Sequence, residues 1–260
     1  MHTVLSIAQK CRFRDEGYLV LPGAVSRAQV TAARHAINHS LGEEGMNKDE
    51  LPRMRSQTYC REIREDAAIS DLANRSSVIP AVESLVGAGN VQTPGGGQIA
   101  LRFPRAPGED PGAPRGHLDG LGSGANGIDR GVYNRGFTSL AVVYLCDVPE
   151  PNMGNFTVWP GSHLFFAEHL RQNGHEILAE GMPQVELPQG PLQITGQRGD
   201  LVIAHHLLVH TAAPNTSSET RYAAIFRLRH KEVESVGLEA FTDLWREWPG
   251  VAELDGAPAQ

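Results

Sequence analysis

Short runs of apolar residues dominate the second half of the chain. Six runs have the length and the β-branched or aromatic content of strands, and they cover residues 97–103, 140–148, 155–160, 200–206, 207–212 and 221–230. Two stretches rich in glycine and proline, 107–116 and 120–131, separate the first run from the second and cannot continue a strand. The pattern therefore predicts a mainly β barrel or sandwich, with these two loops framing the mouth of a pocket.

The first third of the chain has helical spacing instead. Ser26 can cap a helix, and the apolar residues that follow it recur at intervals of three or four, at Val30, Ala33, Ile37 and Leu41. This spacing predicts an amphipathic helix over 26–41 that packs on the outside of the sheet.

Two further helices are predicted from local signals. One covers residues 67–86 with an interruption near Pro80, and the other covers 162–170 with Ser162 as its cap. The resulting organisation is a single domain of residues 1–260. It has a helical scaffold at about 1–96, a β core at 97–230, and a C-terminal helix and tail at 231–260.

Composition and charge narrow the class of partner. The formal net charge is −7, so the chain would repel a phosphate backbone and we expect no nucleic-acid partner. No run reaches the roughly 18 consecutive apolar residues of a membrane helix, and the start MHTVLSIAQKCRFRDE lacks the pattern of a secretory signal. We therefore expect a cytoplasmic protein that acts on a small molecule.

Three side chains have the spacing of a metal centre. His117 and Asp119 are two residues apart, so in an extended strand they project from the same face. A second imidazole from a distant strand would complete two histidines and one carboxylate on one face of an octahedron, which is the ligand set of non-haem iron(II) oxygenases. His210 is the candidate, and strand alternation leaves His205 or His206 as alternatives.

Arg221 follows His210 by eleven residues, in the next predicted strand. A buried arginine beside a metal offers a planar pair of donors to a carboxylate. The cosubstrate 2-oxoglutarate needs such a partner, because its keto acid end chelates iron while its far carboxylate must be held. The spacing therefore predicts that Arg221 binds 2-oxoglutarate. The alternative is a surface ion pair.

The ordered combination of motifs resembles the phytanoyl-CoA dioxygenase (PhyH) family. The motifs are FRDEGYLVLPGAVS at 13–26, HLD at 117–119, WPGSH at 159–163, and GDLVIAHHLLVH at 199–210 followed by Arg221. The resemblance implies a double-stranded β-helix, a cupin-like jelly roll. It also implies His117, Asp119 and His210 as ligands of Fe(2+), and Arg221 as the residue that holds 2-oxoglutarate.

Two further positions follow from the same resemblance. Gln98 matches a position on an early strand where members of that family have a glutamine, and this glutamine contacts the cosubstrate. Relatives often carry a serine two residues after the distal histidine, whose hydroxyl helps to hold the cosubstrate carboxylate, whereas this chain has Ala212.

The expected reaction is hydroxylation of a small organic, anionic substrate, with consumption of O2 and release of succinate and CO2. Halogenating relatives replace the carboxylate ligand with a small residue, so Asp119 favours hydroxylation. Two other functions stay open. One is a cupin-type metalloenzyme that does not use 2-oxoglutarate, and the other is a catalytically silent relative that only binds a small molecule.

Four residues are candidates for substrate contact. Arg102 and Arg135 lie among the arginines that surround the HLD motif, and they could recognise an anionic group. Tyr133 and Trp159 could form an apolar wall. The alternatives are solvated loop charges for the arginines and ordinary core packing for the aromatic residues.

Overall fold

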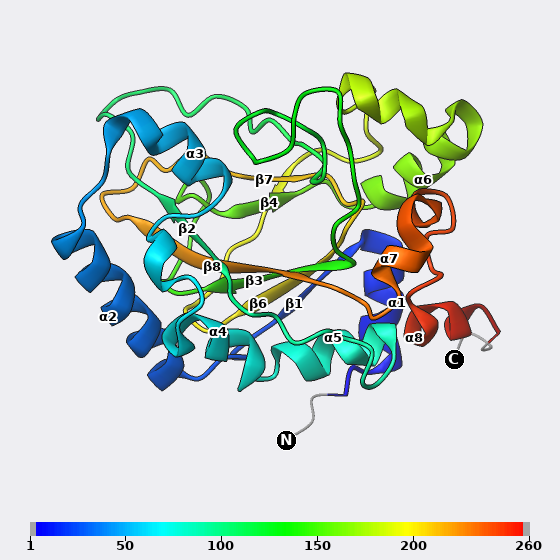
Figure 1. Cartoon of the computed structure of the whole chain (residues 1–260), viewed down its shortest axis with the longest axis horizontal. Helices are drawn as coiled ribbons and strands as arrows, with labels where there is room; N and C mark the ends of the chain where they lie inside the picture. Colours follow the sequence, from blue (N-terminus) through cyan, green and yellow to red (C-terminus); the bar gives the residue numbers. More distant parts are fainter. Residues whose placement is uncertain (1–3, 257–260) are drawn as a thin grey trace.

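Two antiparallel sheets form the centre of the protein, as shown by a computed structural model that describes residues 4–256 (Figure 1). The eight strands are β1 (Tyr18–Leu21), β2 (Gln98–Arg102), β3 (Ser139–Tyr144), β4 (Phe156–Val158), β5 (Leu192–Gln193), β6 (Leu201–His205), β7 (His210–Ala212) and β8 (Arg221–Leu228). The larger sheet has the order β1-β6-β3-β8-β2, and the smaller has the order β5-β4-β7. All six predicted strands are present.

Two strands were not predicted. The strand β1 lies within the region expected to be a helical scaffold, and it pairs with β6 at the edge of the larger sheet. The strand β5 has two residues and pairs with β4. Both are too short to show the alternation that identifies a strand in a sequence. They are strands because they pair with β6 and β4, and their own residues give no sign of it.

The helices are α1 (Ile7–Glu16), α2 (Arg27–Glu43), α3 (Leu51–Ser56), α4 (Ala67–Asn74), α5 (Val78–Val86), α6 (Ser162–Asn173), α7 (Val233–Val236) and α8 (Pro249–Ala252). Ser26 caps α2 as predicted, through a capping box with Gln29. The interruption expected near Pro80 lies at residues 75–77 instead. Pro80 stands in the first turn of α5, where a proline is tolerated.

The predicted cap of α6 was wrong. Gly161 is the N-cap residue, and the hydroxyl of Ser162 accepts a hydrogen bond from the backbone N–H of Val209 at 2.9 Å. This bond ties the start of α6 to the segment that enters β7. The helices α1 and α3 were not predicted.

Strand alternation divides the apolar residues into two layers. On β3, Ala141 and Val143 point outward and pack with residues of α1, α2, α4, α5 and α8. Leu140 and Val142 point inward, into a second cluster between the two sheets. In Figure 1, α4 and α5 lie along one side of the larger sheet, and the smaller sheet and the long loops lie on the other. The inner faces of the two sheets therefore carry the side chains that can form a pocket.

No helix within residues 4–256 is long and apolar enough to cross a membrane.

Candidate metal centre

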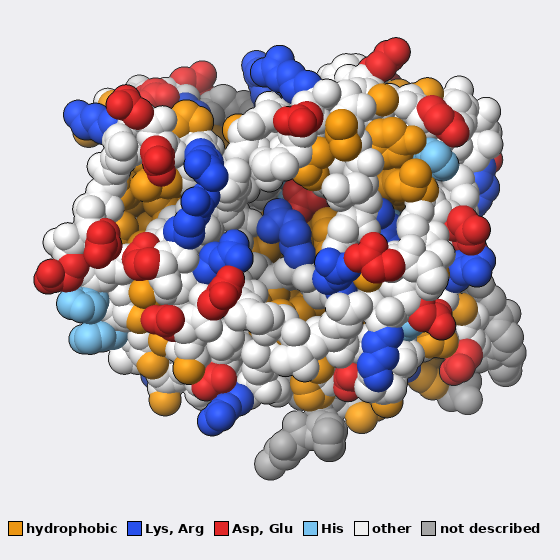
Figure 2. All heavy atoms as spheres, in the orientation of Figure 1, with side chains coloured by type: hydrophobic (Ala, Val, Ile, Leu, Met, Phe, Trp, Pro, Cys, Tyr) orange, Lys and Arg blue, Asp and Glu red, His pale blue; other side chains and the backbone are white. Residues whose placement is uncertain are grey.

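A cavity of about 530 Å³ opens between the inner faces of the two sheets. Strands β2, β3 and β8 form one wall, and β4 and β7 form the other. The loop at 117–128 and the end of α3 lie at its mouth. Figure 2 shows a hollow near the middle of this side of the molecule, with Lys and Arg side chains gathered at its rim.

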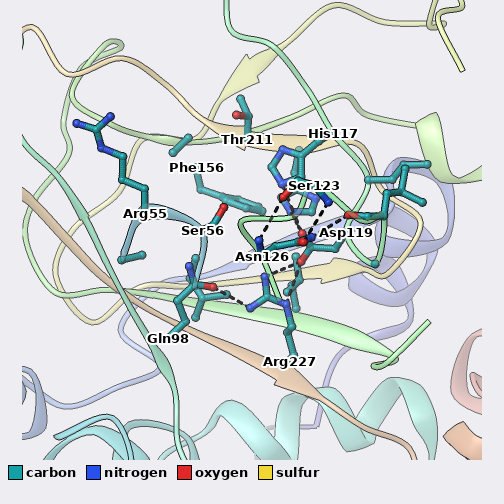
Figure 3. Close-up of a pocket in the computed structure, with 18 of the residues that line it drawn as sticks. Arg55, Ser56, Gln98, His117, Asp119, Ser123, Asn126, Phe156, Thr211 and Arg227 are labelled. Atoms are coloured by element: carbon teal, nitrogen blue, oxygen red, sulfur yellow. Dashed lines mark hydrogen bonds and ion pairs between the residues drawn. The ribbon is translucent and has the colours of Figure 1, made fainter. Parts of the chain in front are cut away.

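The three predicted metal ligands meet in this cavity. His117 and His210 form an isolated antiparallel bridge, in which each backbone N–H donates to the other residue's carbonyl at 3.0 and 3.1 Å. Their imidazole rings therefore lie side by side, with centroids 4.6 Å apart. Asp119 places Oδ1 at 3.4 Å from Nε2 of His117 (Figure 3). The same oxygen lies 3.8 Å from Nε2 of His210.

This arrangement fits a transition metal. One ligand atom from each of the three residues lies within 4.8 Å of the others. Ligand bonds of about 2.1 Å would bring neighbouring ligand atoms to about 3 Å, so a small contraction of the three side chains would complete the site. Two imidazoles and one carboxylate on a single face form the set that binds non-haem iron(II) and leaves the opposite positions open.

The protonation states suit metal binding. Burial, together with the nearby His117, lowers the pKa of His210 to about 4, so its imidazole is neutral at pH 7. Its Nδ1–H donates to the carbonyl of Leu208 at 2.9 Å, which leaves Nε2 as a free lone pair facing Asp119. Burial alone would raise the pKa of Asp119, but the charge of Arg227 and the hydrogen bond with His117 hold it below its usual range.

The alternative distal ligands are excluded by position. The ring of His205 stacks on Trp248 at a centroid distance of 5.0 Å, and its Nε2 lies 3.3 Å from the carbonyl of Leu244. The ring of His206 lies beside that of His205 and near Phe241. Both imidazoles are buried in a C-terminal aromatic cluster, away from the lining of the metal cavity.

Arg221 lines the same cavity and is 4% exposed. Its Nε donates to the carbonyl of Gly154 at 2.7 Å, and its Nη1 donates to the carbonyl of Ala100 at 2.9 Å. These bonds fix the plane of the guanidinium at the cavity wall. Burial, with the nearby charge of Arg102, lowers the pKa of Arg221 to about 10, so it stays charged at neutral pH. No ion pair with an acidic group is found for it within residues 4–256.

Arg227 is the residue near the metal ligands that the sequence analysis missed. Its Nε and Nη2 donate to Oδ2 of Asp119 at 3.0 and 2.8 Å, and its Nη1 donates to Oε1 of Gln98 at 2.7 Å (Figure 3). The alternation along β8 could have indicated it. Residues 221, 225 and 227 share one face of that strand and all line the cavity.

Of the four predicted substrate residues, Arg102 lines the cavity. It stands opposite Arg221 in the pairing of β2 with β8, so the two side chains project from the same face. Burial lowers the pKa of Arg102. Arg102 therefore lies in the cavity, beside the residue expected to hold the cosubstrate, and its contact with the substrate stays a prediction.

The other three predicted substrate residues do not line this cavity. Arg135 is buried and forms an ion pair with Glu247, so its charge is already neutralised. The hydroxyl of Tyr133 lies 2.9 Å from Nδ1 of His175, and Trp159 is buried in an apolar cluster. The cavity is lined instead by polar and apolar residues of α3 and of the loops, at Arg55, Ser56, Ser123, Asn126, Ile128 and Met182.

A jelly roll that holds two histidines, an aspartate and a buried arginine in one cavity defines a non-haem iron(II)- and 2-oxoglutarate-dependent oxygenase. The chain matches the family model "Phytanoyl-CoA dioxygenase (PhyH)" over residues 13–223 and belongs to this family. Its cofactors are accordingly iron(II) and 2-oxoglutarate. No curated protein sequence matches the chain at a significant level.

Solved structures support the fold. The 2-oxoglutarate-dependent carbocyclase SnoK from nogalamycin biosynthesis is 23% identical, with a TM-score of 0.56 over 85% of this chain and 82% of that one. HygX from Streptomyces hygroscopicus with nickel and 2-oxoglutarate bound is 17% identical, with a TM-score of 0.54 over 87% of each chain. EctD from S. alaskensis with 2-oxoglutarate and 5-hydroxyectoine is 16% identical, with a TM-score of 0.54 over 88% of this chain and 77% of that one. The predicted double-stranded β-helix is confirmed.

Proposed function

We propose that this oxygenase hydroxylates a small anionic organic molecule, with release of succinate and CO2. The observation that carries the proposal is the convergence of His117, Asp119, His210 and Arg221 on one cavity between the sheets. When bound, iron(II) and 2-oxoglutarate supply oxidative chemistry in which O2 is consumed as the 2-oxo acid is decarboxylated. A carboxylate at position 119, rather than a small residue, favours hydroxylation over halogenation.

In this reaction the protein would hold the metal, orient the cosubstrate and keep water out of the cavity. Nε2 of His117, Oδ1 of Asp119 and Nε2 of His210 would hold the metal on one face. The guanidinium of Arg221 would hold the far carboxylate of 2-oxoglutarate, with Gln98 as a further contact. Apolar side chains on both walls, Leu140, Val142, Phe156 and Ile225, reduce the access of water to the cavity.

The charges of the cavity favour an anionic substrate. Four arginines line it, at positions 55, 102, 221 and 227. Asp119 is the one acidic residue among the lining residues that the structure describes, and Arg227 is paired with it. The remaining positive charges raise the local concentration of anions. If Arg221 holds the cosubstrate, Arg102 is the partly buried cation available for a carboxylate or phosphate group of the substrate.

Replacing Arg102 with methionine should raise the KM for the substrate at least about tenfold, because a charged hydrogen bond is lost from a partly buried site. The affinity for iron(II) should not change. Arg105→Met is the matched control, since Arg105 is ion-paired with Glu109 in the neighbouring loop. A KM that is the same in Arg102→Met and in the wild type would contradict a role for Arg102 in substrate binding.

The proposed function is tested by adding iron(II) and 2-oxoglutarate to the apo protein without oxygen. Chelation of the metal by the keto acid should give a visible charge-transfer band. Oxygen should then yield succinate, and the substrate should gain the mass of one oxygen atom. A band without oxygen insertion in any product would overturn hydroxylation. Metal binding without the band would favour a cupin-type enzyme that does not use 2-oxoglutarate, and binding of neither ligand would favour a silent relative.

The single-domain organisation with its three segments and the cytoplasmic location stay predictions from the sequence.

A further inference from the structure

The two carboxylate oxygens of Asp119 have different neighbours. Oδ1 faces the imidazoles of His117 and His210, at 3.4 and 3.8 Å from their Nε2 atoms. Oδ2 points the other way and accepts two hydrogen bonds from Arg227. The side chain of Asp119 is 12% exposed, so water cannot readily replace either set of contacts. Figure 3 shows Arg227 reaching from below toward Asp119.

This difference matters because a carboxylate can bind a metal through one oxygen or through both. If the metal were held by two imidazoles and a single oxygen of Asp119, an octahedral coordination sphere would leave three positions for other ligands. The proposed reaction would need all three, because the cosubstrate would chelate through two atoms and O2 would need one more. If both oxygens of Asp119 bound the metal, only two open positions would remain.

We propose that Arg227 is a positioning residue that holds Oδ2 of Asp119 away from the metal, so that Asp119 binds through Oδ1 alone. This inference rests on the proposed function, since it concerns the iron(II) site of that oxygenase. Arg227 acts on the metal through Asp119.

The guanidinium of Arg227 is itself fixed in place. Its third donor, Nη1, bonds to Oε1 of Gln98 at 2.7 Å, and its cation lies 5.9 Å from the ring centroid of Phe137. Because a guanidinium is planar, the bonds to Asp119 and Gln98 together determine its orientation. A lysine would keep the positive charge but could not make the same set of bonds in one plane.

The ion pair is not a main source of folding stability. The side chain of Arg227 is 39% exposed, and ion pairs that reach solvent contribute little to the free energy of unfolding. Its removal should therefore leave the fold intact while it changes the metal site. Groups that hold a metal ligand from behind typically change metal affinity by about 10- to 100-fold when they are removed.

The test compares Arg227→Met with Arg229→Met in the full-length apo protein. Arg229 is the matched control, because its side chain is also 39% exposed, its partner is Glu234, and it does not line the cavity. The dissociation constants for iron(II) and for cobalt(II) are measured without oxygen and without 2-oxoglutarate. We expect both constants to rise about 10- to 100-fold in Arg227→Met and to stay unchanged in Arg229→Met.

Arg227→Lys separates geometry from charge. Its cobalt(II) absorption spectrum, which reports coordination number, should differ from the wild-type spectrum, as should that of Arg227→Met, because Oδ2 is then free to bind. A wild-type spectrum in both variants would overturn the proposal. Unchanged or tighter metal binding in Arg227→Met would also overturn the proposal. Arg227 would then only compete with the metal for Asp119 and would not position it.

These readouts do not depend on turnover. If the wild type binds iron(II) and 2-oxoglutarate while Arg227→Met behaves like the wild type, the inference fails, and this result does not count against the proposed function. If the wild type fails to give the charge-transfer band, the proposed function fails, and the metal affinities still decide the role of Arg227. An equal loss of melting temperature and of metal affinity in Arg227→Met and Arg229→Met would show a structural role and overturn the proposal.

Discussion

Replacing Asp119 with alanine will reduce iron-dependent succinate formation by at least about two orders of magnitude. Loss of a group behind a metal ligand already costs about 10- to 100-fold, and loss of the ligand itself should cost more. The substitution also removes the one negative charge among the lining residues described, and so leaves Arg227 without its partner. Succinate is measured with saturating 2-oxoglutarate and substrate, and iron(II) affinity is measured on the same variant.

Asp119→Asn tests the charge with little change of shape. We expect it to retain the fold and to bind iron(II) weakly, because a neutral amide is a poorer ligand for the metal than a carboxylate. Asp129→Ala is the control, since Asp129 is an exposed acid in the neighbouring loop that does not line the cavity. Wild-type succinate formation by Asp119→Ala would show that the carboxylate is not a ligand, and the assigned metal centre would then be wrong.

The sequence predicted those parts of the site that depend on strand alternation and spacing. His117 and Asp119 meet because a two-residue spacing repeats the side-chain direction of an extended backbone. His210 joins them through backbone pairing with His117, which the order of the strand-like runs made plausible but did not determine. Arg221 was found from its distance of eleven residues after His210, in the next predicted strand. Strand alternation was not applied to that strand, although it puts Arg227 on the same face as Arg221.

The parts that could not be predicted depend on contacts between distant residues. Nothing near Arg135 in the sequence indicates that its partner is Glu247, 112 residues later, yet this ion pair removes it from the substrate site. Tyr133 lies in a glycine-rich region whose course follows tertiary contacts such as the one with His175. The α3 helix, which brings Arg55 to the cavity, has six residues and too few turns for periodicity to identify it.

Replacing Arg221 with methionine will raise the dissociation constant for 2-oxoglutarate by about 30-fold to a few thousand-fold. This range corresponds to the loss of about 2–5 kcal/mol when one partner of a buried charged pair is removed. Methionine keeps much of the apolar stem but offers no donor to the cosubstrate or to the carbonyls of Gly154 and Ala100. The constant is measured without oxygen by titration of the charge-transfer band in iron(II)-loaded protein.

The choice between 2-oxo acids shows what Arg221 recognises. The wild type should strongly prefer 2-oxoglutarate to 2-oxovalerate, which has the same chelating end but no far carboxylate, and Arg221→Met should lose most of this preference. Arg221→Lys should recover part of it, because the charge returns without the planar pair of donors. Arg198→Met is the control, since Arg198 is exposed and paired with Asp147. If Arg221→Met keeps the wild-type preference, the far carboxylate is held elsewhere, and the other arginines of the cavity become the candidates.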